Sequence, residues 1–194
     1  MTELYLVRHG ETEWSRSGQH TGTTDLELTE LGRHQASRLK APLASIHFDA
    51  VYSSPRKRAR ETAKLAGFAD VEIRDELAEW NYGELEGLTK DEIQQRFPEW
   101  RIWSGPVPGG ESGEEVLARL GGFVDEIRAS EHERVLAFAH GHSLRVLTLA
   151  WLGLPIESGD LFELSTATMS VLSDDETGPK IIHWNCPTDD RIAD

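Results

Sequence analysis

The chain has 194 residues, of which 38% are hydrophobic and 28% are charged, so we expect one globular domain over residues 1–194. Its formal net charge of −14 argues against nucleic acid or an anionic membrane as a partner, because both would need a basic surface. The sequence has neither an apolar run near the roughly 20 residues of a membrane span nor a signal-peptide pattern, and its single cysteine, Cys186, suits a reducing compartment, so we expect a cytoplasmic protein.

Short apolar runs alternate with helical segments along the first half of the chain. Residues 3–7 and 50–53 are predicted to be buried strands. Between them, the spacing of the apolar positions predicts a helix that follows Leu28 and ends near Pro42. The inward face of this helix is predicted from Leu31, Gln35, Leu39 and Leu43.

The second predicted helix starts with a cluster of basic residues. Ser54 and Pro55 stand where an N-cap and a first helical residue belong, and the helix is predicted to continue to about Ala66. Residues 56–58 then fall in the first turn, where the helix dipole disfavours each cation by about 0.3–1 kcal/mol. We interpret Arg58 as a ligand that joins helical N–H groups in binding an anion. The other cations are interpreted as a solvated face: Arg56, Lys57 and Arg60.

Two capping boxes mark helix starts in the second half of the chain. Thr89 with Glu92 opens a short helix that stops before Pro98, and Ser112 with Glu115 opens a longer one. The segment 80–112, which ends in a stretch rich in Trp, Pro and Gly, is predicted to form a lid-like part of the same domain. The inward face of the longer helix is predicted from Val116, Leu120, Phe123 and Ile127.

The C-terminal part of the chain supplies further predicted strands, at residues 135–139, 169–173 and 180–183. The polar tail, 187–194, is predicted to be frayed. Because short strands alternate with helices, the sequence predicts the α/β class, as a three-layer sandwich in which helices flank a mostly parallel central sheet.

Unusual polar residues follow three of the predicted strands. The first strand ends in Arg8, His9 and Gly10, the second precedes the basic run, and the third ends in the sequence HGH at 140–142. In open α/β sheets, ligands bind beyond the carboxyl ends of the strands, so we expect all three groups to meet at one edge of the sheet.

The histidines differ in what their positions indicate. His140 repeats the arrangement of His9 at the end of a buried strand. His140 and His142 could also be metal ligands, but no Asp or Glu lies close by in the sequence, and arginines near His9 would repel a divalent cation. We interpret the remaining histidines as structural imidazoles: His20, His34, His47, His132 and His183.

Four stretches together resemble one protein family. LVRHGET, SSPRKRARETA, LAEWNYGELEG and FAHGHSLR, in this order and spacing, resemble the histidine phosphatase superfamily, in the branch that includes cofactor-dependent phosphoglycerate mutases. Within that branch, the stretches TEWSRSGQHTG, AEWNYG and AHGHSLR are similar to the corresponding motifs of broad-specificity acid phosphatases and sedoheptulose-1,7-bisphosphatase. The resemblance spans Leu4 to about Leu147 and implies a phosphoglycerate mutase-like fold.

The resemblance implies roles for the residues that match the family's motifs. It makes His9 the nucleophile that is transiently phosphorylated, Glu79 the proton donor to the leaving group, and Arg8, Arg58 and His140 the residues that hold the phosphoryl group. No metal or other cofactor is expected. The loop positions that would touch phosphate or substrate are Ser15, Thr21, Gly22 and Gly141.

The chemistry of these side chains suits the implied roles. A neutral imidazole can divide a slow hydrolysis into phosphorylation and dephosphorylation, and planar guanidinium groups match phosphoryl oxygens. Arg8 and Arg58 are expected to lower the pKa of His9 and so keep its lone pair available. Glu79 must be protonated when substrate is bound, which the neighbouring rings of Trp80 and Tyr82 should promote.

The resemblance leaves a choice between hydrolysis and mutase activity. Mutases of the family usually carry an arginine pair after an Ile-Trp in a longer lid, whereas here Trp103 is followed by Ser104 and Gly105. Trp80 stands where mutases often have Arg, and Arg101 is the only clear cation of the lid. We therefore expect a phosphatase that acts on small phosphorylated metabolites such as sugar phosphates or bisphosphates, with phosphoglycerate mutase as the alternative.

Two further points stay open in the sequence. A binding module that kept the fold and lost the chemistry is a third class of function, and it has no support because every catalytic position is filled. The oligomeric state is also open, with a homodimer among the alternatives.

Overall fold

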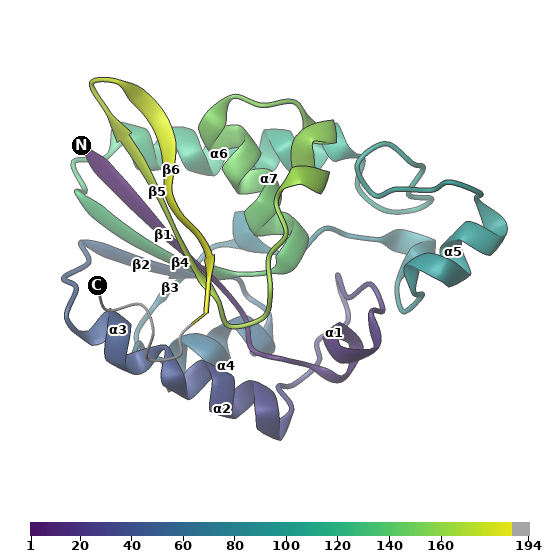
Figure 1. Cartoon of the computed structure of the whole chain (residues 1–194), viewed down its shortest axis with the longest axis horizontal. Coiled ribbons are helices and arrows are strands. Elements are labelled where there is room, and N and C mark those ends of the chain that lie inside the picture. Colours follow the sequence, from purple (N-terminus) through teal and green to yellow (C-terminus); the bar gives the residue numbers. More distant parts are fainter. Residues whose placement is uncertain (188–194) are drawn as a thin grey trace.

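A computed structural model gives the fold, and the structure describes residues 1–187. A six-stranded sheet with the strand order β3-β2-β4-β1-β5-β6 lies between two groups of helices (Figure 1). The strands are β1 (Thr2–Arg8), β2 (Ala50–Ser53), β3 (Glu72–Ile73), β4 (Arg134–Ala139), β5 (Met169–Asp175) and β6 (Gly178–Cys186). β1, β2, β3 and β4 pair in parallel, while β5 pairs antiparallel with β1 and β6 antiparallel with β5. The predicted α/β sandwich with a mostly parallel sheet is confirmed.

The helices cover both faces of the sheet (Figure 1). α2, α3 and α4 lie on one face, and α6 and α7 lie on the other. The α-helices are α1 (Glu13–Ser17), α2 (Glu30–Arg38), α3 (Lys40–Ala44), α4 (Lys57–Leu65), α5 (Lys90–Arg96), α6 (Gly113–Ala129) and α7 (Gly141–Leu152). Three short 3₁₀ helices are η1 (Asp75–Leu77), η2 (Gly83–Leu85) and η3 (Ile156–Leu161).

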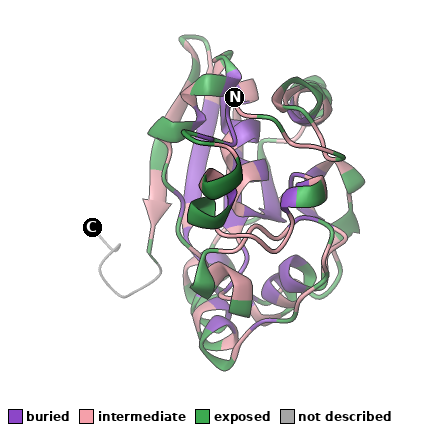
Figure 2. Ribbon diagram, turned by 90° about the vertical axis from the view of Figure 1, so that its right-hand side faces the viewer, coloured by how far each residue is buried: buried purple, intermediate pink, exposed green. Residues whose placement is uncertain are grey.

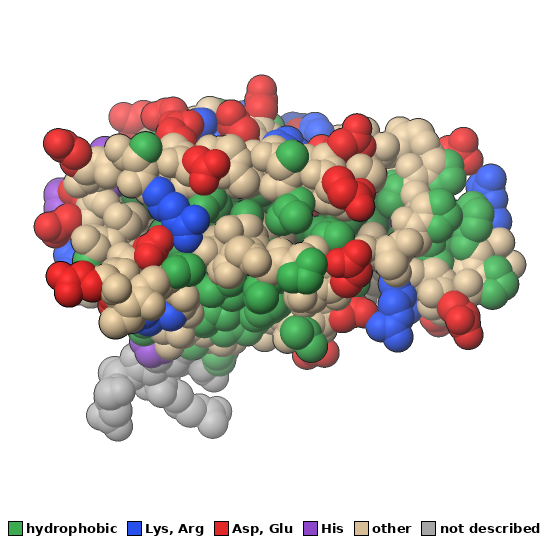
Figure 3. Space-filling model, turned by 90° about the horizontal axis from the view of Figure 1, so that it is seen from above, with side chains coloured by type: hydrophobic (Ala, Val, Ile, Leu, Met, Phe, Trp, Pro, Cys, Tyr) green, Lys and Arg blue, Asp and Glu red, His purple; other side chains and the backbone are tan. Residues whose placement is uncertain are grey.

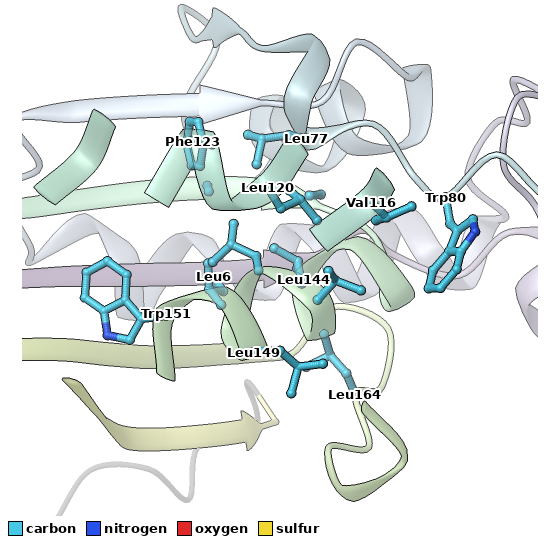
Figure 4. Close-up of a cluster of buried hydrophobic side chains, with 14 of the residues drawn as sticks. Leu6, Leu77, Trp80, Val116, Leu120, Phe123, Leu144, Leu149, Trp151 and Leu164 are labelled. Atoms are coloured by element: carbon cyan, nitrogen blue, oxygen red, sulfur yellow. The ribbon is translucent and has the colours of Figure 1, made fainter. Parts of the chain in front are cut away.

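The core has one part on each face of the sheet, and the central strands are buried between them (Figure 2). The larger part joins the sheet to α6 and α7, where Leu6, Leu120 and Leu144 pack together (Figure 4). All four residues predicted for the inward face of α6 are buried, and both predicted capping boxes are present. The smaller part, under α2, α3 and α4, includes Val7 and Phe138.

Aromatic side chains anchor the segment 80–112 to the larger core. Trp80, Tyr82, Trp100 and Trp103 are each at most 4% exposed. The Trp80 Nε1 atom donates a hydrogen bond to the Glu111 carbonyl at 2.8 Å, which ties the two ends of the segment together. The segment is therefore packed against the rest of the fold, and its predicted lid function stays a prediction.

The first predicted helix is divided into α2 and α3, which is a correction. Pro42 has no N–H, and its ring would collide with the Arg38 carbonyl in a continuous helix, so the helix breaks at Leu39. Leu39 and Leu43 are fully buried as predicted, whereas Leu31 is 53% exposed.

The start of α4 also differs from the prediction. The helix begins at Lys57 with Arg56, not Ser54, as its N-cap. The Ser54 hydroxyl accepts a hydrogen bond from the Arg56 N–H at 3.3 Å and also lies 2.7 Å from the Nε2 atom of His140. The Lys57 N–H donates to the Asp25 carboxylate at 2.8 Å, and this negative charge at the helix N-terminus offsets the cost of the nearby cations.

Acidic side chains are spread over the face above α6 and α7, as the net charge leads one to expect (Figure 3). In the described part of the chain, no helix is both long and apolar enough to cross a membrane. The predicted frayed tail, 187–194, lies outside the described residues apart from Pro187.

Candidate active site

The three polar groups that follow β1, β2 and β4 lie together at the carboxyl edge of the sheet. In the parallel register, Arg8 of β1 is opposite Ala139 of β4, and Ser53 of β2 is opposite Phe138. The His9 N–H donates to the Ala139 carbonyl at 3.0 Å. The imidazole rings of His9 and His140 therefore come close, with 5.2 Å between their centroids.

A cavity of about 160 Å³ opens beside these residues. Six residues that the sequence analysis singled out line it: Arg8, His9, Ser15, Thr21, Glu79 and Gly141. Three others, Gly22, Arg58 and His140, do not. The lining is completed by Gly18, Gln19, His20, Tyr82, His142, Arg145 and Leu164.

The His9 imidazole is held in one orientation. Its Nδ1 atom lies 2.7 Å from the Gly10 carbonyl oxygen, and because a carbonyl only accepts hydrogen bonds, Nδ1 carries the proton and Nε2 has a free lone pair. Burial, followed by the charges of Arg58 and Arg8, holds the pKa of His9 well below its ordinary value. The ring is therefore neutral and its Nε2 atom is available as a nucleophile.

Gly10 must be glycine because the loop that carries His9 lies directly against helix α2. A Cβ atom at Gly10 would lie 2.3 Å from the Gly32 carbonyl oxygen, and one at Gly32 would lie 2.1 Å from the Glu11 carbonyl oxygen. The loop that carries His9 and helix α2 thus meet backbone to backbone, which fixes the position of the loop.

The Arg8 guanidinium has hydrogen-bonding capacity to spare. One Nη atom donates to the Leu164 carbonyl, while the buried Nε atom has no hydrogen-bond partner within residues 1–187. A Cβ atom at Gly141 would lie 3.2 Å from the Arg8 Cζ atom, so the glycine makes room for the guanidinium beside the N-terminus of α7. A buried donor without a partner, next to a helix N-terminus, suits the binding of an anion.

Arg58 and His140 lie behind His9 and are fully buried. The Arg58 guanidinium donates to the His140 Nδ1 atom at 3.1 Å and to the carbonyls of Thr24 and Thr21 at 3.0 and 2.9 Å. Burial, followed by the positive charge of Arg58, holds the pKa of His140 well below its ordinary value. His140 therefore packs beside the ring of His9, and Arg58 holds the loop around residues 21–24 through its carbonyls.

Gly22 is part of the same braced loop. Its carbonyl accepts a hydrogen bond from Arg58, and its N–H donates to the Glu86 carboxylate at 3.1 Å. A Cβ atom at Gly22 would lie 2.4 Å from the Trp80 carbonyl oxygen, so only glycine fits between the loop and the segment 80–112.

The Glu79 carboxylate lies in the cavity and against the N-terminus of α7. Its Oε1 atom accepts hydrogen bonds from the N–H groups of Trp80 and Ser143 at 2.9 and 2.7 Å, and its Oε2 atom accepts one from His142 at 3.0 Å. The setting is more polar than the neighbouring rings of Trp80 and Tyr82 alone suggested. Because Oε2 accepts only one N–H, it is the oxygen with capacity left for a proton.

His142 adds a hydrogen-bond donor that the sequence analysis did not assign to the site. Its Nδ1 atom lies 2.6 Å from the Tyr82 hydroxyl, which makes no other hydrogen bond among the described residues. Burial raises the pKa of Tyr82 and lowers that of His142, so a phenol and a neutral imidazole face each other. We assign the phenol proton to this bond, which leaves the His142 Nε2–H as a donor.

Two more residues of the cavity were missed or interpreted differently. His20 was interpreted as structural, yet it lines the cavity with its ring stacked 6.0 Å from that of His142, and nothing in the sequence indicated this. Arg145 lies one helical turn after Gly141, and the FAHGHSLR motif contains it. Its spacing of four residues could have placed it on the same face of α7 as the cavity.

Within residues 1–187, no three His, Cys, Asp or Glu side chains gather in an arrangement that could hold a metal ion. Both ring nitrogens of His140 are engaged, by Arg58 and by Ser54. The arrangement therefore gives no support to a metal held by His140 and His142.

The chain has an α/β fold with a histidine-centred cavity at the carboxyl edge of its sheet, and comparison with known proteins gives its family. Residues 4–187 match the model of the histidine phosphatase superfamily (branch 1), and the chain belongs to that superfamily. A solved structure of a Mycobacterium tuberculosis protein superposes with a TM-score of 0.92 at 36% identity, covering 97% of this chain and 99% of that one.

The similar proteins include both phosphatases and mutases. An acid phosphatase of Mycobacterium tuberculosis is 42% identical over 87% of this chain and 84% of its own. A sedoheptulose 1,7-bisphosphatase of Saccharomyces cerevisiae is 35% identical over 78% of this chain and 68% of its own. A 2,3-bisphosphoglycerate-dependent phosphoglycerate mutase of Methylorubrum populi is 39% identical over 84% of this chain and 85% of its own. The resemblance predicted from the sequence is confirmed.

Proposed function

We propose that this enzyme hydrolyses phosphomonoesters of small metabolites, in particular sugar phosphates or bisphosphates, through a phosphohistidine at His9. The observation that carries the proposal is the pairing of a neutral His9, whose Nε2 lone pair is free, with an Arg8 guanidinium whose buried Nε atom has no partner in the described part of the chain. A nucleophile next to an unsatisfied cation is what phosphoryl transfer needs.

In the first step, the His9 Nε2 atom attacks phosphorus and forms an N–P bond while the bond from phosphorus to the ester oxygen breaks. Arg8 and the N-terminus of α7 bind the negative charge that spreads over the phosphoryl oxygens. The departing oxygen takes a proton from Glu79, whose carboxyl group lines the same cavity. Arg58 and His140 keep the His9 ring and its loop in place from behind.

In the second step, water attacks the phosphorus of the phosphohistidine and the N–P bond breaks. The Glu79 carboxylate formed in the first step accepts the proton of the attacking water, so one residue acts as acid and then as base. The products are inorganic phosphate and a neutral His9, ready for another cycle.

The substrate class follows from the size and polarity of the cavity. At about 160 Å³ it suits a small ester, and its outer lining of Gln19, His20 and His142 offers hydrogen-bonding groups for hydroxyls. The names of the phosphatase relatives, one of which is a sugar bisphosphatase, support the same class.

The test is hydrolysis of p-nitrophenyl phosphate, followed by a screen of phosphorylated metabolites for phosphate release. We expect hydrolysis that a chelator does not inhibit and that His9→Ala abolishes, with the exposed His47→Ala as the matched control. Hydrolysis that survives in His9→Ala would contradict the proposal. Loss of activity on chelation would instead point to a metal-dependent reaction.

Phosphoglycerate mutase is the second candidate, because a mutase is among the relatives. Against it, Arg101 is exposed and pairs with Asp160 at 2.6 Å outside the cavity, and no arginine pair follows Trp103. The segment 80–112 therefore contributes no cation to the cavity lining. Bisphosphate-stimulated interconversion of phosphoglycerates that exceeds phosphate release would favour the mutase.

A further inference from the structure

Arg145 is a cation of the cavity for which the proposed reaction gives no role. Its guanidinium is half-buried at the cavity wall, and within residues 1–187 no carboxylate lies within ion-pair distance of it. Its only protein hydrogen-bond acceptor in that range is the Gly159 carbonyl, which takes bonds from Nε and one Nη atom. Glu79 and Asp160 act on it only through their longer-range field.

A half-buried guanidinium without a carboxylate partner has donors left for a ligand. Burial lowers the pKa of Arg145, but an arginine remains charged at any pH at which the enzyme would work. Charged side chains are rarely buried without a close compensating charge, so an anionic group of a ligand would suit this position. Because the proposed reaction assigns Arg8 to the phosphoryl group beside His9, Arg145 is left for a second anionic group.

Trp103 holds Arg145 in place from the other side. The Arg145 Cζ atom lies 4.5 Å from the centroid of the Trp103 ring, a cation–π contact. The same ring lies 5.3 Å from the ring of His142, and its own exposure is only 4%. Trp103 does not line the cavity, yet it packs against two side chains that do.

Gly159 of η3 contacts both Trp103 and Arg145 and so fixes their relative positions. A Cβ atom there would lie 2.3 Å from Cε3 of Trp103, so the indole lies directly against the backbone of the residue whose carbonyl binds Arg145. Three separate elements, the segment 80–112, α7 and η3, thus converge to orient one guanidinium.

We propose that Trp103 is a positioning residue that holds Arg145 at the cavity wall to bind a second anionic group of the substrate. This inference rests on the proposed phosphatase function and narrows its substrates to esters with a second phosphate or a carboxylate. The two anionic groups of such a substrate would then be bound by different arginines of the cavity lining, one by Arg8 beside His9 and the other by Arg145 of α7.

The test compares two sugars that differ by one phosphate, used as competitive inhibitors of p-nitrophenyl phosphate hydrolysis. We expect the wild-type enzyme to bind fructose 1,6-bisphosphate about tenfold or more tightly than fructose 1-phosphate, since a second charge-assisted contact forms only with the former. Arg145→Gln and Trp103→Leu should bring the ratio of the two inhibition constants close to one. Trp103→Phe, which keeps an aromatic face, should retain most of the preference.

Arg96→Gln is the matched control, because Arg96 is an exposed cation of the same segment that pairs with Glu84 outside the cavity, and its ratio should equal that of the wild type. An absent preference in the wild type, or a preference that Arg145→Gln leaves unchanged, would overturn the inference. Arg145→Gln and Trp103→Phe supply the test should Trp103→Leu fail to fold. Failure of p-nitrophenyl phosphate hydrolysis itself would refute the proposed function instead, so the two failures are distinct.

Discussion

The Arg58 guanidinium donates a hydrogen bond to the Nδ1 atom of His140, and this single contact fixes the protonation of the histidine. Because a guanidinium has no acceptor, Nδ1 must be unprotonated and the ring proton must be on Nε2, which donates to the Ser54 hydroxyl at 2.7 Å. His140 is therefore a neutral and fully committed link between α4 and β2, next to His9.

Arg58 should contribute strongly to stability because it is fully buried and satisfies the carbonyls of Thr21 and Thr24. We expect Arg58→Met to lower the free energy of unfolding by about 3 kcal/mol, since it leaves buried acceptors without partners. Urea denaturation measures this, with Arg60→Met as the control, because Arg60 is exposed on the same helix. An Arg58→Met protein as stable as the wild type would show that the buried network is unimportant.

Stability should fall as the pH drops below about 6.5. Burial is the first cause that holds the pKa values of His9, His140 and His142 below the value of about 6.5 that they take in the unfolded chain. Between the folded and unfolded pKa values the unfolded chain binds more protons, so the free energy of unfolding rises with pH there and is lost as pH falls. Each histidine contributes up to about 1.4 kcal/mol per pH unit.

The pH effect can be measured by urea denaturation between about pH 5 and pH 7.5. His142→Asn should reduce the slope of the free energy of unfolding against pH by the contribution of one histidine. His47→Asn should match the wild type, because His47 is exposed. An identical slope in wild type and His142→Asn would contradict the assignment of a neutral buried imidazole.

Glu79→Gln should affect substrates according to their leaving groups. An alkoxide needs a proton to depart, whereas p-nitrophenolate does not. The substitution should therefore lower kcat/KM by about 10²–10⁴-fold for a sugar phosphate and by much less for p-nitrophenyl phosphate. The ratio of kcat/KM values for the two substrates in one protein sample reports this without correction for folding. Equal losses for both would argue against Glu79 as the proton donor.

The contact between Gly32 and the loop of His9 predicts an effect at a distance from the cavity. Gly32→Ala places a methyl group 2.1 Å from the Glu11 carbonyl oxygen, so α2 or the loop must shift, which should cost about 1–3 kcal/mol and reduce kcat. Gly122→Ala is the control, since Gly122 is exposed on α6 and a Cβ atom there would meet nothing within 4 Å. Unchanged stability in Gly32→Ala would show that the loop is not held by α2.

The sequence predicted the fold well because its signals were local. Short apolar runs between helical segments predicted the strands. The capping boxes of Thr89 with Glu92 and of Ser112 with Glu115 are present as predicted. The predicted start of α4 was wrong: the Ser54 hydroxyl does accept a hydrogen bond from the Arg56 N–H, but the helix begins only at Lys57. The same hydroxyl also contacts His140, which is distant in sequence. The side chain of Leu31 matched the helical pattern, yet it is 53% exposed and lies outside the core.

The site was less predictable wherever its contacts join distant parts of the chain. Motifs located Arg8, His9 and Glu79, which do line one cavity. No local pattern shows that Arg58 is enclosed by the carbonyls of residues 21–24, or that Trp103 packs on Arg145. These relationships depend on the packing of the segment 80–112 and η3 against α7, which only the folded chain defines.

The central claim is that the phosphoryl group passes through the Nε2 atom of His9. Rapid mixing of the enzyme with p-nitrophenyl phosphate, quenching in alkali where phosphohistidine survives, and peptide mass spectrometry test it most directly. We expect a phosphate on the peptide that contains His9, present in the His47→Ala control and absent from His9→Ala. A phosphate on another residue, or phosphate release by His9→Ala at the wild-type rate, would contradict it.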